Sequence, residues 1–192
     1  MHAPPVRSST VRRARPTDAT GIAAVHVASW QAAYRGILPT SYLARLDPRR
    51  LAVRWRDAAR RPRDGCSLWV AERDEVIGFA RTGPCADPAL VGFAGEVFML
   101  YVHPHWWSGG HGRRLLEWAV DDLEAQGYFW AVVGVLADNA PARAFYERTG
   151  FSRDGASSLD RIGGAAVRVV RYARPINAHP LLARGLASLT GG

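Results

Sequence analysis

The 192-residue sequence contains no lysine, so its formal net charge of +8 rests on 25 arginines against 17 acidic residues. Arginine codons are rich in G and C, and part of this excess is therefore codon bias. The remaining positive balance favours anionic partners such as phosphorylated cofactors, nucleotides or nucleic acid. No RNP, zinc-finger or evident helix-turn-helix pattern accompanies it, so we expect no nucleic-acid partner.

Cysteine is equally scarce, with only Cys66 and Cys85 and no CxxC spacing. The pair gives no disulfide framework and points to a reducing compartment. The longest apolar run, residues 128–137, is too short to cross a bilayer. The first ten residues, MHAPPVRSST, lack the apolar centre of a signal peptide. We therefore expect a cytoplasmic protein without a membrane partner.

Hydrophobic residues make up 48% of the chain and charged residues 22%, which is ordinary for a globular domain of this length. Strand-like and helix-like periodicities alternate in the central part, which predicts one mixed α/β domain at 10–174 between tails at 1–9 and 175–192. The second tail includes a possible short helix at 180–189. We expect strands near 10–14, 67–72, 76–81, 95–102, 128–136, 151–159 and 165–173. We expect one helix at about 17–35, a second that begins at residue 48, a third that begins after residue 112 and ends at 126, and a fourth at 139–149. A turn is expected at 39–46.

The expected second helix opens with Asp47 at the N-cap and Pro48 in its first turn. It carries a run of arginines at positions 49, 50, 54, 56, 60, 61 and 63. We interpret this run as a solvated helix face, and a phosphate or nucleic-acid patch is the alternative.

The stretch VHPHWWSGGHGRRLL, residues 102–116, places glycines between an apolar strand and an amphipathic helix. Glycines let backbone amides crowd around an anion, and the free amides of a helix's first turn point at it. The residues alone are also compatible with a plain tight turn. No GK[ST] or GxGxxG pattern is present, which argues against a P-loop or a Rossmann dinucleotide site.

This stretch resembles the acyl-CoA loop of the GNAT superfamily of N-acetyltransferases, V-x-P followed by Q/R-x-x-G-x-G/A. The pattern runs from Trp107 through Gly110 to Gly112, and Trp107 stands where Gln or Arg is usual. NAPARAFYERTGF, residues 139–151, resembles the family element N-x-x-A-x-x-F-Y-x-x-x-G-F at every defining position. HVASWQAAYRGILP, residues 26–39, is similar to the acceptor-side helix region of a bacterial GNAT subgroup.

The resemblance implies an α/β (α+β) GNAT fold, with a mixed, mostly antiparallel central sheet of about seven strands flanked by about four helices. It implies an enzyme that moves an acetyl group from acetyl-CoA to a primary amine. A small-molecule amine is favoured over a protein N-terminus or lysine, and a homodimer is left open. The alternative is a catalytically silent acyl-CoA-binding regulatory or interaction protein.

The resemblance also assigns roles to residues. Tyr146 would protonate the leaving thiolate, and Glu96 would accept the amine's proton through water. Backbone N–H groups near the end of the strand would polarise the thioester carbonyl. Trp30 and Tyr34 would line the acceptor cleft. The expected cofactor contacts are Leu100, Tyr101, Val102, Trp107, Ser108, Gly109, Gly110, His111, Gly112, Arg113, Asn139, Ala142 and Phe145.

Each of these roles has a simpler alternative. Tyr146 could be a core aromatic, Glu96 a solvated strand-end residue and Asn139 only a helix N-cap. Trp30 and Tyr34 share a helix face that core packing also explains. His103 and His105 would share one side of an extended strand, but without Cys or carboxylates at ligand spacing we expect no metal. Neither cysteine has a nucleophile-and-base setting, which favours direct attack in a ternary complex.

Overall fold

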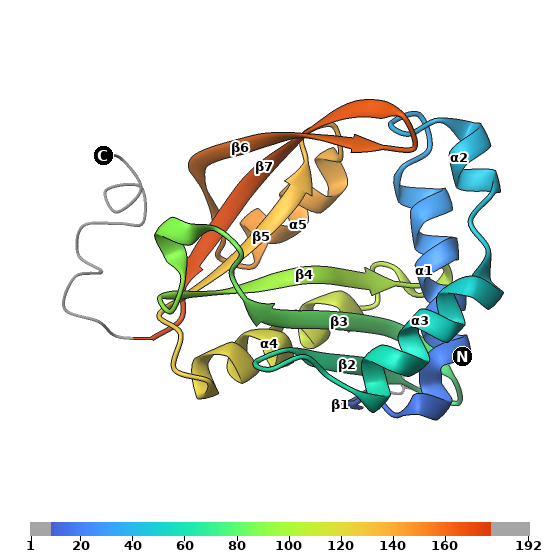
Figure 1. Cartoon of the computed structure of the whole chain (residues 1–192), viewed down its shortest axis with the longest axis horizontal. Coiled ribbons are helices and arrows are strands. Elements are labelled where there is room, and N and C mark those ends of the chain that lie inside the picture. Colours follow the sequence, from blue (N-terminus) through green and yellow to red (C-terminus); the bar gives the residue numbers. More distant parts are fainter. Residues whose placement is uncertain (1–8, 178–192) are drawn as a thin grey trace, which may run out of the picture.

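The computed structural model describes residues 9–177 and contains a seven-stranded sheet with helices on both faces (Figure 1). The strand order is β1-β2-β3-β4-β5-β7-β6, and of these neighbours only β4 and β5 run parallel. This confirms a mixed, mostly antiparallel sheet. The strands are β1 Thr10–Arg13, β2 Ser67–Glu72, β3 Val76–Pro84, β4 Ala94–Val102, β5 Trp130–Leu136, β6 Ser152–Ile162 and β7 Ala165–Pro175.

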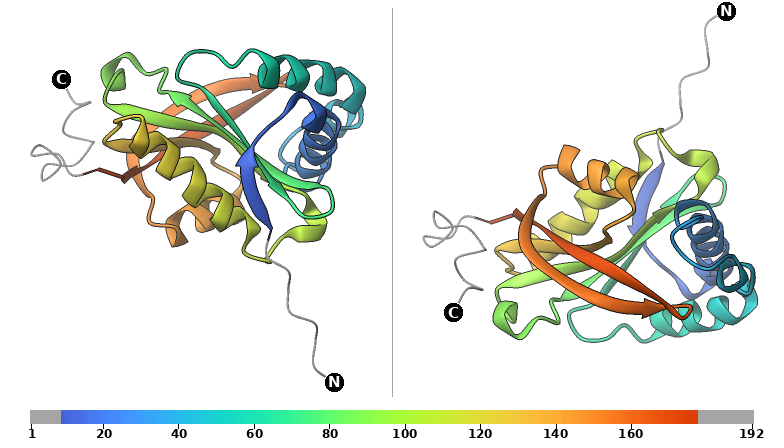
Figure 2. Two further views of the ribbon diagram at one scale, coloured as in Figure 1. Left: turned by 90° about the horizontal axis from the view of Figure 1, so that it is seen from below. Right: turned by 90° about the horizontal axis from the view of Figure 1, so that it is seen from above.

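Four main helices and one short helix cover this sheet, with α1 and α3 on one face and α4 and α5 on the other (Figure 2). On the first face, Ile22 and Val25 pack with Trp55 and Phe79. On the second face, apolar residues of α4 at helical spacing pack against β4 and β5. The helices are α1 Ala19–Ala33, α2 Thr40–Ala44, α3 Pro48–Arg60, α4 His111–Ala125 and α5 Ala140–Arg148.

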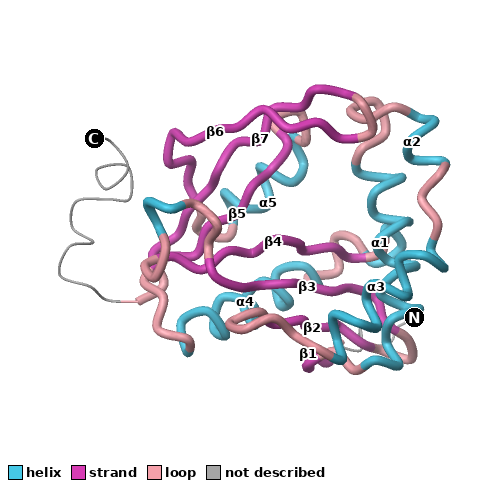
Figure 3. The backbone as a smooth tube through the Cα atoms, in the orientation of Figure 1, coloured by secondary structure: helices cyan, strands magenta, loops and turns pink. Residues whose placement is uncertain are grey.

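Strands β4 and β5 pair over three residues each and then diverge (Figure 3). The paired positions are Ala94–Glu96 on β4 and Trp130–Val132 on β5. On its other edge β4 stays paired with β3 up to Val102, with a register shift that leaves Phe98 as an extra residue. The β5-facing edge of β4 beyond Glu96 is therefore free to meet a ligand.

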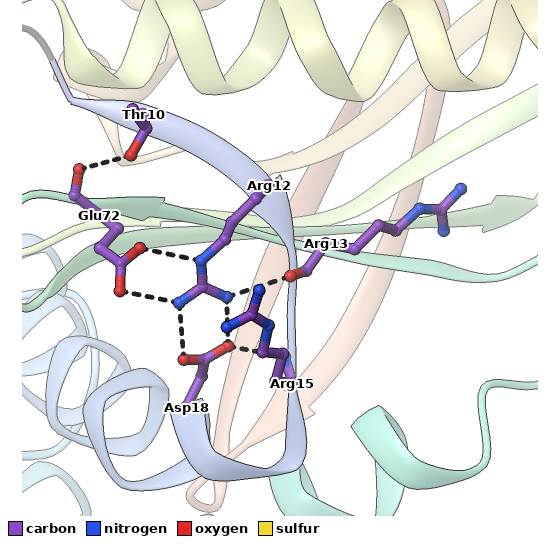
Figure 4. A network of polar contacts seen from close by, with 6 residues as sticks. All are labelled: Thr10, Arg12, Arg13, Arg15, Asp18 and Glu72. Atoms are coloured by element: carbon purple, nitrogen blue, oxygen red, sulfur yellow. Dashed lines mark hydrogen bonds and ion pairs between the residues drawn. The ribbon is translucent and has the colours of Figure 1, made fainter.

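Arg12 joins β1, β2 and the entry to α1 through two bidentate ion pairs (Figure 4). Its guanidinium lies 2.7–2.9 Å from the carboxylate oxygens of Asp18 and Glu72. Arg12 accordingly lowers the pKa of both carboxyl groups, in each case mainly through its side-chain hydrogen bonds. The network fixes the start of α1, the helix that carries Ser29 and ends at the C-cap residue Tyr34.

The side chain at the N-cap of α1 does not cap this helix. The Asp18 carboxylate accepts from the backbone N–H of Arg15 at 2.6 Å and from Arg12, not from an amide of α1. The expected turn at 39–46 contains helix α2, because backbone N–H groups of Tyr42 and Leu43 bond the Pro39 carbonyl and Leu43 is buried.

Within residues 9–177, no helix combines the length and apolar character needed to cross a membrane. The expected terminal tails lie outside the described residues except at Ser9 and residues 175–177, and the short helix expected at 180–189 lies wholly outside them.

Candidate functional site

A cavity of about 850 Å³, here called the interstrand cavity, lies where β4 and β5 diverge. Residues 97–102 of β4 form one wall and residues 133–136 of β5 form the opposite wall. The loop before α4 and one side of α5 close one end, and Ser29 of α1 and Tyr34, the C-cap residue of α1, lie at the other. The cavity thus runs through the sheet from the α4 and α5 face toward α1.

The glycine-containing loop presents backbone amides to this cavity. Gly110 is the N-cap of α4 with φ 78°, and no side chain caps the helix, so its first-turn amides lack a capping partner. Ser108 has φ 63° and is the one non-glycine residue with positive φ in the described chain. Such strained backbone is costly and concentrates at binding sites. The geometry suits an anion such as a pyrophosphate.

Trp107 fastens this loop to the end of β4. Its indole Nε1–H donates to the carbonyl oxygen of Val102 at 2.7 Å, and the hydroxyl of Ser29 donates to the same oxygen at 2.9 Å. The side chain is 48% exposed and also lines the cavity. Trp107, which departs from the family pattern, therefore holds the loop to the end of β4, a role that its position in the motif did not reveal.

The other loop residues divide between cavity wall and core. Ser108, Gly110, Gly112 and Arg113 line the cavity, whereas Gly109 and His111 do not. The His111 ring is buried with its Nδ1 2.9 Å from the Ser9 hydroxyl. Burial, with smaller effects from Arg73 and Arg114, lowers the pKa of His111. Gly109 is packed so closely that an added Cβ would lie 3.0 Å from that ring.

Tyr146 belongs both to the core and to the cavity wall. Its ring contacts Phe145 and Phe151 at centroid distances of 5.1 and 5.6 Å, and only 6% of the residue is exposed. Burial, with a further effect of Tyr34, raises its pKa well above the usual value. The phenol therefore stays protonated at any ordinary assay pH.

Glu96 lies at the closed end of the divergence and does not line the interstrand cavity. Burial raises the pKa of its carboxyl group, although one oxygen lies 3.5 Å from the Ala86 backbone N–H. Nearby, Arg171 bridges Asp87 and Asp154 at 2.5 Å each. The carboxylate is therefore neither freely solvated nor part of that ion-pair bridge.

Asn139 is the N-cap of α5, and its Oδ1 accepts from the Ala142 backbone N–H at 3.2 Å. Together with Ala142 and Phe145 it also lines the cavity. The N-cap interpretation therefore holds, and a contact with a bound molecule remains compatible with it.

The two residues expected at the acceptor cleft, Tyr34 and Trp30, have different surroundings. Tyr34 lines the cavity, and its hydroxyl lies 3.4 Å from that of Tyr101. Trp30 is not a lining residue and packs edge-on against Tyr34 with ring centroids 5.1 Å apart. Leu100, Tyr101 and Val102 line the cavity from β4, as expected.

Several residues that line the cavity were not predicted from the sequence, and Gly134 and Ser29 are two of them. Gly134 is the one exposed position in the otherwise buried strand β5. A glycine inside an apolar strand often marks a place where a ligand or another backbone segment comes close to the strand. Ser29 gave no such signal, because only the tertiary fold places its hydroxyl on the Val102 carbonyl. In the described chain, no cluster of three or more His, Cys, Asp and Glu side chains has metal-site geometry.

Comparison with known proteins agrees with this geometry. The sequence profile of the Acetyltransferase (GNAT) family matches residues 28–151. The chain is 33% identical to the N-acetyltransferase YuaI of Bacillus subtilis over 138 residues, which cover 72% of this chain and 77% of YuaI. It is also 42% identical to mycothiol acetyltransferase of Streptomyces coelicolor, but over 46% of this chain and 28% of that enzyme.

The fold matches as well. The crystal structure of PaiA N-acetyltransferase from Thermoplasma acidophilum in complex with coenzyme A superposes with a TM-score of 0.63 at 19% identity, covering 88% of this chain and 99% of that one. The profile match spans more than half of the sequence. The chain is therefore a member of the GNAT family, an acyltransferase that uses acetyl-CoA as its co-substrate.

Proposed function

We propose that the protein transfers the acetyl group of acetyl-CoA to a primary amine of a small molecule by direct attack in a ternary complex. The observation that carries this proposal is the interstrand cavity. It joins the uncapped amides at the α4 N-terminus to the unpaired edge of β4 and to Tyr34.

The donor would lie along this cavity with its pyrophosphate on the amides of residues 108–113. Helix N-termini stabilise such anions through free N–H groups and the helix dipole. Trp107 would keep the loop in place, and Gly109 and His111 would take part through their backbone alone. Asn139, Ala142 and Phe145 would contact the pantetheine arm. Leu100, Tyr101 and Val102 would line the thioester, and a backbone N–H of this segment on the unpaired edge of β4 would polarise its carbonyl.

The amine nitrogen would attack the carbonyl carbon, and the carbon–sulfur bond would break to release CoA thiolate. Tyr146 would donate the proton that this thiolate takes up. A phenol can fill this role because its ordinary pKa of about 10 keeps it protonated, and able to donate to the forming thiolate, at neutral pH. The raised pKa of Tyr146 keeps the proton on the phenol until the thiolate forms.

Glu96 would accept the proton that the attacking ammonium loses, through water because the carboxylate stands outside the cavity lining. The raised pKa of Glu96 makes its carboxylate a stronger base than an exposed glutamate. An alkylammonium with a pKa near 10.4 is mostly protonated at neutral pH, so such a step is needed.

A covalent acyl-enzyme is less favoured. Neither Cys66 nor Cys85 lines the interstrand cavity, and burial raises the pKa of the Cys85 thiol. A thiol that keeps its proton is a poor nucleophile.

The amine would enter beside Tyr34, with Trp30 supporting that ring. We also propose a catalytic domain at 10–174, a cytoplasmic location and no nucleic-acid or membrane partner, and we leave a homodimer open. The competing function is an acyl-CoA-binding regulatory protein without catalysis.

The test is release of free CoA thiol from acetyl-CoA in the presence of a panel of amines. Amine-dependent thiol release together with an acetylated product supports the proposal. Tight acetyl-CoA binding with no turnover on any amine would instead favour the silent binding protein.

A further inference from the structure

A second cavity of about 590 Å³, here called the arginine cavity, lies between the end of α3, the chain that follows it and the strands β2 and β3. Five cationic side chains line it, whereas Asp57 is its one acidic residue. The cations are Arg54, Arg60, Arg61, Arg63 and Arg81. The fold thus gathers part of the α3 arginine run with Arg81 from β3, a grouping that a solvated helix face does not require.

These arginines have no acidic partner in the structure. Within residues 9–177, the ion pairs involve Arg12, Arg13, Arg113 and Arg171, none of which lines this cavity. Like charges held together without counter-charges repel one another, and an anion between them relieves that repulsion. Guanidinium groups also match phosphate and carboxylate oxygens in bidentate geometry.

The arginine cavity shares a face of the sheet with Glu96. Arg81 and Gly83 are two residues apart on β3, and Gly83 is paired with Glu96 on β4, so the three positions face the same side. A Cβ on Gly83 would lie 2.7 Å from the sulfur of Cys66, a residue that lines the arginine cavity.

Phe98 links the two cavities. It lines the interstrand cavity, and the guanidinium of Arg81, which lines the arginine cavity, lies 5.8 Å from the centroid of its ring. A molecule anchored by its anionic group in the arginine cavity would therefore extend along the face of the sheet that carries Phe98 and Glu96.

We propose that the arginine cavity binds the anionic group of the acceptor, so that the substrate is a small primary amine carrying a phosphate or carboxylate. This inference rests on the proposed acetyl transfer. Polycationic amines are disfavoured as acceptors, since the five arginines repel them. The charge run in α3 thereby acquires a function that its surface exposure did not reveal.

The first test is calorimetric titration of the CoA-saturated protein, in which the α4 loop is already occupied. The probes are aminopropyl phosphate and the neutral analogue aminopropanol. We expect the phosphate to bind at least about tenfold more tightly, with a preference that shrinks at high salt. The triple variant R54Q/R61Q/R63Q should lose most of that preference. The matched variant R49Q/R50Q/R56Q, which changes three exposed arginines of α3 outside the cavity, should retain it.

Equal binding of the two probes, or equal behaviour of the two triple variants, would overturn the proposal. A second measurement assigns the site to the acceptor. Inorganic phosphate should inhibit acetylation of aminopropyl phosphate competitively with the amine and not with acetyl-CoA. Non-competitive inhibition or activation would reject the acceptor role and indicate a separate effector site.

Failure of the proposed enzymatic function would look different. In that case the wild-type protein would release no CoA thiol from acetyl-CoA with any amine, and the arginine cavity could not be an acceptor site. The calorimetric comparison would still decide whether the arginines hold an anion.

Discussion

The indole N–H of Trp107 donates a 2.7 Å hydrogen bond to the carbonyl oxygen of Val102, and this bond ties the glycine-containing loop to the end of β4. The same oxygen accepts from Ser29, so the last residue of β4 is held from α1 and from the loop at once. The residue that departs from the family pattern thereby fixes the two elements that the donor site requires.

Replacing Trp107 by Phe keeps an aromatic ring but removes the N–H donor. The hydrogen bond contributes about 1 kcal/mol to holding the loop in its binding conformation. Its loss should therefore raise the KM for acetyl-CoA about fivefold, with a smaller change in kcat. Steady-state thiol release at varied acetyl-CoA measures this. Trp118→Phe, at a 43% exposed position on α4, is the control. An unchanged KM in Trp107→Phe would show that the bond does not position the loop.

Replacing Tyr146 by Phe removes the proposed acid while leaving the ring in its core contacts. We expect kcat to fall about 100-fold, the lower end for general acid catalysis. Because the pKa of Tyr146 is raised well above its usual value, deprotonation of this phenol should not reduce wild-type activity up to about pH 10. Tyr42→Phe, outside the cavity lining, provides a matched control. A Phe variant with wild-type kcat throughout the pH range would rule the role out.

Replacing Glu96 by Gln removes the proposed base with little change of shape. Activity should fall about 100-fold. The raised pKa of Glu96 implies that wild-type kcat/KM declines on acidification already above the ordinary glutamate range, as the carboxylate takes up a proton. The variant should lack that acidic limb. The control variant Glu75→Gln, at an exposed position between β2 and β3, should keep both the wild-type activity and the decline of kcat/KM on acidification. Two identical pH profiles for wild type and Glu96→Gln would assign the base elsewhere.

His26 makes stability depend on pH. It lies among Trp30, Trp55, Phe79 and Tyr101 with its Nδ1 buried and unpartnered. Burial, assisted by Arg54, lowers its pKa from 6.5 to about 4.

The folded protein thus binds fewer protons at His26 than the unfolded chain does between pH 6.5 and 4, and stability falls as pH falls through that window. The full effect is about 3 kcal/mol. Urea unfolding at several pH values should show this slope, and His26→Leu should flatten it whatever its absolute stability. The exposed His105→Gln should leave the slope as in wild type. A slope unaltered by His26→Leu would contradict the depressed pKa.

The sequence by itself determined the element order and the two motifs, since hydrophobic periodicity, glycine stops and N-caps are local features. The sheet class followed from the family resemblance that the two motifs carry. Gly127 and Gly150 follow the C-caps of α4 and α5 with positive φ, and Asn139 caps α5. The identity of the loop after β4 was equally readable, because its spacing is a local property of the chain.

Only the tertiary structure decided what depends on contacts between distant residues. It placed Tyr146 in a cavity wall and Glu96 outside that wall, and it gave the Trp107 indole a partner five residues away across a 3₁₀ turn. It also joined Arg81 of β3 to the arginines after α3 around one cavity. Burial, strand pairing and unpaired charge follow from packing in three dimensions, so no periodicity in the sequence could reveal them.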